Sequence, residues 1–84
     1  MLTNNSPDVL KNTKGDIFMK IKYNLYEIRT ERNLTLRQLQ DLSGIGIATI
    51  NRIENGIANP TIEVICQLAL ALECSPCDLF EMVT

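Results

Sequence analysis

The sequence predicts an all-α protein, because apolar residues recur at helical spacing and residues that cap helices precede several of these runs. Few segments combine β-branched residues with strict alternation, which argues against a sheet. With 84 residues and 45% hydrophobic content, the chain has room for one domain with a compact core. The four aromatic residues, and the absence of Trp, indicate that this core is aliphatic; they are Phe18, Tyr23, Tyr26 and Phe80.

Residues 1–18 differ in composition from the rest of the chain. They carry Asn, Ser, Pro, Gly and Lys with little periodicity, which predicts a disordered or loosely packed arm before a domain at residues 19–84. Met19 could itself be a start codon, so that the arm would be a dispensable leader. Lys11 and Lys14 leave open an arm that touches phosphate.

Five short helices are expected from Lys20 onward. In the first, Ile21, Leu25 and Ile28 form an apolar stripe that ends near Asn33. The second begins at Thr35, whose spacing from Gln38 is that of a capping box, and it ends near Ser43 before Gly44.

The third expected helix covers residues 46–55 and ends at Asn55-Gly56. Thr61 caps the fourth, and Ile62, Ile65, Ala69 and Leu72 line one face of it. The fifth begins with Ser75 as N-cap, Pro76 at the first position and Asp78 at the third, and it ends within residues 79–83.

Composition excludes several functions. A net charge of −2 provides no general attraction to phosphate, so nucleic-acid binding would depend on local placement of charge. The absence of His, of a nucleophile paired with a base and of a Gly-rich phosphate loop argues against an enzyme. The lone motif Cys74-Ser-Pro-Cys77, with Cys66 nearby, lacks the further ligands of a zinc site. We expect no metal, no cofactor, no membrane segment and a cytoplasmic location.

The second and third helices, joined through Gly44-Ile45-Gly46, form a helix-turn-helix unit. Ile50 and Ile53 share one face of the third helix and are expected to pack against Leu39 and Ile45. The opposite face is the one that a DNA major groove would meet. The residues at that spacing are Ile47, Ala48, Asn51, Arg52 and Asn55.

The chain resembles the Cro/CI-type helix-turn-helix proteins, also called the XRE family, from about Tyr23 to Phe80. The resemblance rests on IRTERNLTLRQL, the turn at Gly44, TINRIENGIANPTIE and LALALECSPCDLF. It implies a five-helix lambda-repressor-like domain that binds an operator in double-stranded DNA as a homodimer and regulates transcription. A minimal repressor of a phage, a plasmid or another mobile element fits a chain of this kind, as does an antitoxin that represses its own operon.

Individual roles follow from the resemblance. Arg29 and Glu54 match a largely buried salt bridge between the first and third helices. Asn55 matches a position that contacts phosphate. Thr35 and Arg37 lie at the start of the second helix, whose amide end commonly faces a phosphate. Arg52 matches a position that contacts bases. With it, we expect base contacts from Thr49 and Asn51, and packing of Ile47 and Ala48 against thymine methyl groups.

Departures from the family pattern leave a second interpretation open. Leu36 and Ile47 stand where relatives often have polar residues, and Ile57 and Ala58 replace frequent Lys and Arg. A helix-turn-helix face that has lost many DNA contacts could belong to a protein-interaction module, with a protein partner. Several apolar residues at positions that relatives often fill with polar ones indicate a buried patch; they are Leu36, Leu42, Ile47, Ile57, Val64 and Leu70.

The homodimer is expected to form through the C-terminal part of the chain. Two recognition helices must face half-sites about 34 Å apart. A self-complementary apolar patch is the commonest solution. The residues expected to form it are Leu70, Phe80, Met82 and Val83.

Overall fold

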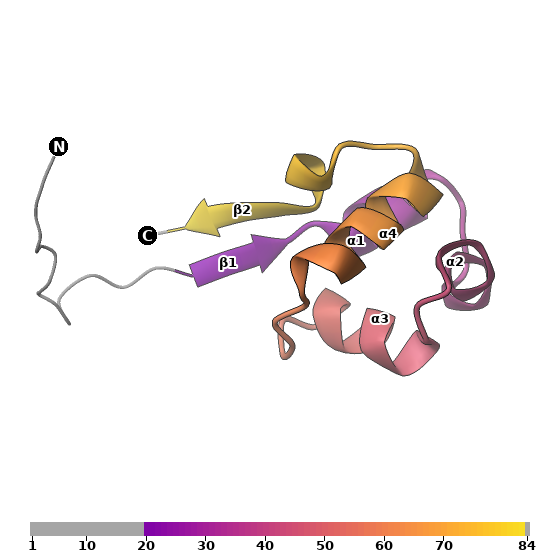
Figure 1. The fold of residues 1–84 in the computed structure, drawn as a ribbon, viewed down its shortest axis with the longest axis horizontal. Helices are drawn as coiled ribbons and strands as arrows, with labels where there is room; N and C mark the ends of the chain where they lie inside the picture. The colour runs from indigo at the N-terminus through magenta and orange to yellow at the C-terminus, as the bar shows by residue number, and fades with distance from the viewer. Residues whose placement is uncertain (1–19, 84) are drawn as a thin grey trace, which may run out of the picture.

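The computed structural model describes residues 20–83, so the predicted arm at residues 1–18 lies outside the described residues. This part of the chain forms four α-helices, a 3-10 turn and two strands (Figure 1). The helices are α1 (Leu25–Glu31), α2 (Leu36–Ser43), α3 (Ile47–Glu54) and α4 (Ile62–Leu72). The turn is η2 (Pro76–Leu79), and the strands are β1 (Lys20–Tyr23) and β2 (Phe80–Val83).

The two ends of the described chain pair with each other, which corrects the expected five-helix arrangement. Lys20–Tyr23 was expected to begin the first helix, but it pairs antiparallel with Phe80–Val83, with Ile21 opposite Met82 and Tyr23 opposite Phe80. The expected fifth helix is the single turn η2, after which the chain becomes extended. The backbone amide of Asn24 donates to the carbonyl of Leu79 at 2.8 Å, so the sheet joins the helical body where α1 begins.

Side-chain caps fix the starts of three helical elements where the sequence placed them. Thr35 and Gln38 form a reciprocal capping box at α2. Thr61 accepts a hydrogen bond from the amide of Val64 at α4. Ser75 and Asp78 form a second capping box at η2. Each such cap satisfies amides that the first helical turn leaves without a partner.

An aliphatic core joins the four helices and η2. Leu39, Ile50 and Ile53 are fully buried together, which confirms the predicted inward face of α3. Burying a side chain of this size contributes about 1.5–3 kcal/mol. The other buried apolar residues are Leu25, Ile45, Ile65, Leu68, Ala69, Leu72 and Leu79.

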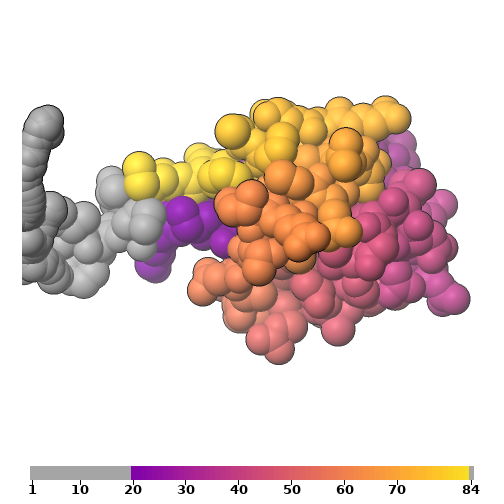
Figure 2. Space-filling model, viewed as in Figure 1, coloured from indigo at the N-terminus to yellow at the C-terminus, as the bar shows by residue number. Residues whose placement is uncertain are grey.

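The apolar face predicted for α4 is buried except at its first residue. Ile65, Ala69 and Leu72 are buried, but Ile62 is 72% exposed. Ile62 is the first residue of α4 and lies beside the two-stranded sheet, where it lines a shallow apolar pocket with Ile21 and Phe80. The sheet extends away from the rounded helical body (Figures 1 and 2), so little of the protein covers this end of α4.

Candidate nucleic-acid interface

The turn between α2 and α3 determines how these two helices meet. Gly44 ends α2 in the left-handed conformation, with φ of 78°, and its amide donates to the carbonyl of Gln40 at 2.8 Å. Residues other than glycine adopt this conformation at a cost of about 1–2 kcal/mol. Ile45 then enters the core, and its amide donates to the hydroxyl of Ser43 at 3.0 Å. These two hydrogen bonds, the left-handed backbone at Gly44 and the buried side chain of Ile45 all stabilise the turn.

The outward face of α3 carries polar side chains. Thr49, Asn51 and Arg52 are exposed, as are Ala48 before them and Asn55 after them. Because Ile50 and Ile53 bury the opposite face, α3 cannot rotate about its axis without exposing the core. Ile47 differs from the other residues expected to read bases, since it is half-buried.

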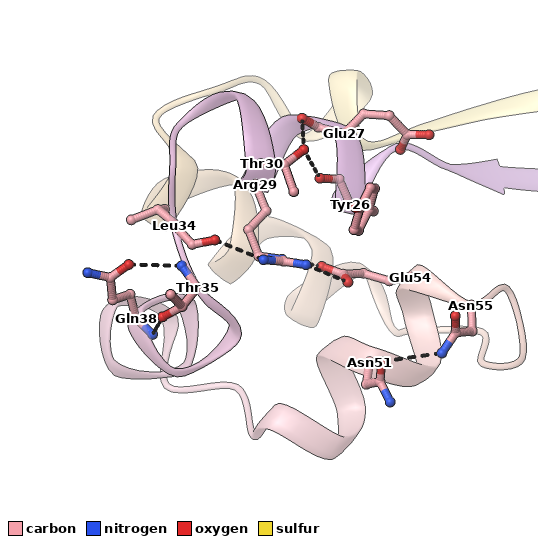
Figure 3. A network of polar contacts seen from close by, with 10 residues as sticks. All are labelled: Tyr26, Glu27, Arg29, Thr30, Leu34, Thr35, Gln38, Asn51, Glu54 and Asn55. Carbon is pink, nitrogen blue, oxygen red and sulfur yellow. Dashed lines mark hydrogen bonds and ion pairs between the residues drawn. The ribbon is translucent and has the colours of Figure 1, made fainter.

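Two polar side chains of this face are joined. Asn55 donates from Nδ2 to Oδ1 of Asn51 at 3.3 Å, one helical turn away (Figure 3). Side chains four residues apart lie next to each other on a helix. The bond therefore places a residue expected to contact phosphate beside one expected to contact a base.

The start of α2 has the features of a phosphate contact. Thr35 accepts from the amide of Gln38 at 3.0 Å, while Gln38 accepts from the amide of Thr35 at 2.8 Å. The first bond along the helix backbone runs from Leu39 to Thr35, so the amides of Leu36 and Arg37 precede the hydrogen-bonded ladder. Such amides and the helix dipole favour an anion. The side chain of Arg37 is exposed at the same end.

Arg29 and Glu54 hold α3 against α1 through a two-fold ion pair (Figure 3). Nε of Arg29 donates to Oε2 of Glu54 at 2.6 Å and Nη2 donates to Oε1 at 3.0 Å. The two side chains are only 10% and 6% exposed. The hydrogen bond to Glu54 raises the pKa of Arg29 above its ordinary value, although burial acts in the opposite direction.

Arg29 makes two further contacts that the sequence did not indicate. Its Nη1 donates to the carbonyl of Leu34 at 2.8 Å, and this bond fixes the position of the chain between α1 and α2 (Figure 3). Its guanidinium group also lies 5.3 Å from the centre of the Tyr26 ring. Arg29 and Glu54 therefore hold α3 in place from its buried side, and they are too buried to contact DNA themselves.

Comparison with known proteins identifies the family. The sequence pattern of the helix-turn-helix family HTH_3 matches residues 25–79, from the start of α1 to the end of η2. This chain belongs to that family. HTH_3 proteins, the Cro/CI type, are DNA-binding transcriptional regulators and not enzymes.

Solved structures support the same conclusion for this HTH_3 protein. It is 35% identical to the restriction-modification controller protein C.AhdI from Aeromonas hydrophila, with a TM-score of 0.65 over 68% of this chain and 86% of that one. It is 34% identical to an HTH_3 family transcriptional regulator from Vibrio cholerae, with a TM-score of 0.61 over 63% of this chain and 30% of that one. The fold also matches the transcriptional regulator VanUg at 18% identity, with a TM-score of 0.64 over 83% of this chain and 97% of that one. No curated protein matches the sequence.

The candidate DNA-binding surface on α2 and α3 carries little charge. On α2 and α3, Arg37 and Arg52 are the basic residues, Asp41 is an exposed acid, and Glu54 is neutralised by Arg29. A protein with few cations releases few counterions when it binds DNA, so its affinity depends only modestly on salt.

The residues expected at the dimer interface do not form one patch in this structure. Leu70, which is 80% exposed, lines a groove between α2 and α4 with Leu42. Phe80 instead lines the pocket that contains Ile21 and Ile62. By strand alternation, Met82 faces the same side of the sheet as Phe80, and Val83 faces the other side.

The apolar positions expected to form one buried patch also divide into two groups. Leu36 and Val64 pack against the core of the domain itself, and Ile47 is half-buried. Leu42, Ile57 and Leu70 remain largely exposed. Leu36 and Val64 therefore serve this fold and give no indication of a partner.

The described residues also bear on a membrane segment, a metal site and the state of the cysteines. Among residues 20–83 no helix has the length and apolar character to cross a membrane. The same residues contain no group of three side chains suited to hold a metal ion. The three cysteines are free thiols; Cys77 is exposed and burial raises the pKa of Cys74.

Proposed function

We propose that this HTH_3 protein is a sequence-specific transcriptional regulator that reads the major groove of an operator with the helix at residues 46–55. The observation that carries this proposal is the exposed polar face of α3, backed by two buried isoleucines and held by the Arg29–Glu54 pair. A helix of this kind presents side chains to base edges in a fixed orientation. We further propose a minimal repressor of a phage, a plasmid or another mobile element.

Arg52 is the proposed main reader of bases. Its planar guanidinium group can donate to both acceptors of one guanine, a contact that carries about 1–3 kcal/mol of discrimination. Asn51 and Thr49 are the further polar readers. Ala48 and the exposed part of Ile47 would pack against thymine methyl groups.

Thr35, Arg37 and Asn55 are the proposed phosphate contacts. Thr35 uses its hydroxyl oxygen to cap α2, which leaves the hydroxyl hydrogen to donate to a phosphate. Arg37 supplies the charge at the same helix end. These contacts would set the register of the protein on DNA without carrying sequence information.

We propose that the regulator acts as a homodimer through the apolar side of the two-stranded sheet. Ile21, Tyr23, Phe80 and Met82 share this side by register, and Ile62 extends it onto α4. The charged residues of the sheet, Lys20, Lys22 and Glu81, face the other side, where Lys22 and Glu81 pair at 3.9 Å. A second copy related by two-fold symmetry would therefore cover this surface without burying a charge.

An antitoxin or protein-interaction module is the second candidate. The observation that favours it is the groove between α2 and α4, where Leu42 is 59% and Leu70 is 80% exposed. Its apolar residues lie away from the polar face of α3. A protein partner could therefore bind this groove with or without DNA on α3.

The test of the proposed function is selection of a binding site by the full-length protein from a pool of randomised DNA duplexes. We expect one enriched palindromic sequence and a saturable complex with it. Binding to a scrambled duplex of the same composition should be at least about 1,000-fold weaker. Equal binding to both duplexes, or no binding at low salt, would contradict the proposal and favour the interaction module.

A further inference from the structure

Gln40 bonds to both sides of the turn that separates α2 from α3. Its backbone carbonyl accepts from the amide of Gly44 at 2.8 Å, which closes the end of α2. Its side-chain Oε1 accepts from the amide of Ile47 at 2.9 Å, and Ile47 is the first residue of α3. The side chain is half-buried between the two helices.

The bond from the Ile47 amide to the Gln40 side chain takes the place of the N-cap hydrogen bond that α3 lacks. Gly46 is the N-cap residue of α3 and has no side chain to accept from the first-turn amides. In α2 and α4 a threonine at this position does so. Gln40 therefore supplies an acceptor to α3 from the neighbouring helix, seven residues earlier in the chain.

We propose that Gln40 is a positioning residue that sets the angle at which α3 enters the major groove, and thereby the discrimination between DNA sequences. This inference rests on the proposed function. Gln40 connects α2, whose start carries two of the three proposed phosphate contacts, directly to the first residue of the proposed reading helix. Arg52 lies five residues further along α3, about 7.5 Å away at 1.5 Å per residue. A tilt of about 10° at Ile47 therefore moves Arg52 by about 1.3 Å, more than the roughly 0.5 Å tolerance of a well-formed binding site.

The bond between the Gln40 side chain and the Ile47 amide also distinguishes the start of α3 from the start of α2. The amide of Ile47 is occupied by Gln40 and cannot donate to a phosphate. The corresponding amides at the start of α2, those of Leu36 and Arg37, precede the hydrogen-bonded ladder of that helix. Loss of the Gln40 side-chain bond should therefore affect sequence reading and leave the proposed phosphate contacts of α2 in place.

The test compares Gln40→Met with Thr61→Ala in the full-length protein. Methionine has the length of glutamine and cannot replace its amide oxygen as an acceptor, whereas Thr61→Ala removes the cap of α4 and does not touch the turn between α2 and α3. The measurement is the ratio of affinities for the duplex selected by the wild type and for a scrambled duplex. We expect Gln40→Met to lower this ratio about tenfold, the equivalent of one hydrogen bond, through weaker binding of the selected duplex. Thr61→Ala should leave the ratio unchanged.

Two further measurements separate positioning from a general loss of stability. Amide hydrogen exchange at Ile47 should be faster in Gln40→Met and unchanged in Thr61→Ala. Gln40→Glu keeps an acceptor at the start of α3, so it should preserve the affinity ratio while its negative charge weakens both complexes equally.

The result that would overturn the inference is an unchanged ratio in Gln40→Met, or an equal loss on both duplexes, while the wild type discriminates between them. Failure to restore the ratio in Gln40→Glu would also overturn it. A wild-type protein that binds both duplexes equally would instead overturn the proposed function, and the role of Gln40 with it.

Discussion

Among single residues, Arg29 and Glu54 hold α3 in position from inside the protein. They connect α1, the chain at Leu34 and the last residue of α3 through three charge-assisted hydrogen bonds. The resemblance to known proteins predicted their pairing. The contact with the Leu34 carbonyl could not be predicted, because it depends on how the chain after α1 turns. Gln40 was missed for the same reason, since its partner amide belongs to another helix.

Removal of either partner of this pair should destabilise the protein strongly. Glu54→Ala or Arg29→Ala leaves one buried charge without its partner, which costs about 3–5 kcal/mol. Lys22→Ala is the control, because the Lys22–Glu81 pair is exposed and should contribute less than about 1 kcal/mol. Urea unfolding of the three variants measures these differences. A loss below about 0.5 kcal/mol for Glu54→Ala would mean that the pair does not stabilise the fold.

Arg37 should contribute to affinity on every DNA sequence alike. It lies at the start of α2, where a phosphate contact carries no sequence information. Arg37→Ala is expected to weaken binding to the selected and scrambled duplexes equally and to reduce the salt slope by about one. Titrations at several salt concentrations measure both quantities. A loss confined to the selected duplex would assign Arg37 to base reading instead.

Among helices and strands, local signals predicted most boundaries. Thr35, Thr61 and Ser75 cap the elements that follow them, and for Thr35 and Ser75 the spacing from Gln38 and Asp78 indicated the capping box. The strands were missed because each has only four residues and pairs with a segment about 60 residues away in the sequence. At that length, alternation in KIKY cannot be separated from the start of the helical stripe at Ile21. A pair of distant strands becomes visible only when the chain is folded.

The turn between α2 and α3 should tolerate substitution at one glycine and not at the other. Gly44 has φ of 78°, so Gly44→Ala places a side chain in the left-handed conformation and should cost about 1–2 kcal/mol. Gly46 has φ of −64° and open space around its Cβ position, so Gly46→Ala should change stability by less than about 1 kcal/mol. Thermal unfolding of both variants tests this. Equal losses would contradict the proposed role of backbone conformation at Gly44.

In the whole molecule, the sheet and α3 occupy different parts of the surface (Figure 1). The sequence placed the dimer contact in the C-terminal part of the chain, yet it combined residues that the structure assigns to separate grooves. Periodicity places Leu70 on the surface of α4, but it cannot show which surface of α4 lies beside the sheet. The exposed polar face of α3 was more predictable, because all its residues belong to one helix.

Dimerisation should respond to Ile62→Glu and not to Leu70→Glu. Both residues are exposed positions of α4, so neither substitution disturbs the core, but only Ile62 lies on the proposed interface. A stable interface needs roughly 800 Å² per partner. The proposed surface comprises five side chains, whereas a stable interface has roughly 20–30 residues per partner, so we expect a weak dimer in the micromolar range that DNA strengthens. Sedimentation at increasing concentration should show Ile62→Glu as a monomer. A dimer that only Leu70→Glu disrupts would place the interface in the groove between α2 and α4.

The central claim is that the exposed face of α3 reads DNA sequence, and Arg52→Ala tests it most directly. The measurement is the affinity of wild type and variant for the selected duplex, for the same duplex with single base changes, and for a scrambled one. Loss of a two-fold contact with guanine should weaken the selected complex by about 1–3 kcal/mol and remove the preference at one base pair, with little change on scrambled DNA. Equal weakening on selected and scrambled duplexes would contradict the claim, because Arg52 would then contact only the DNA backbone.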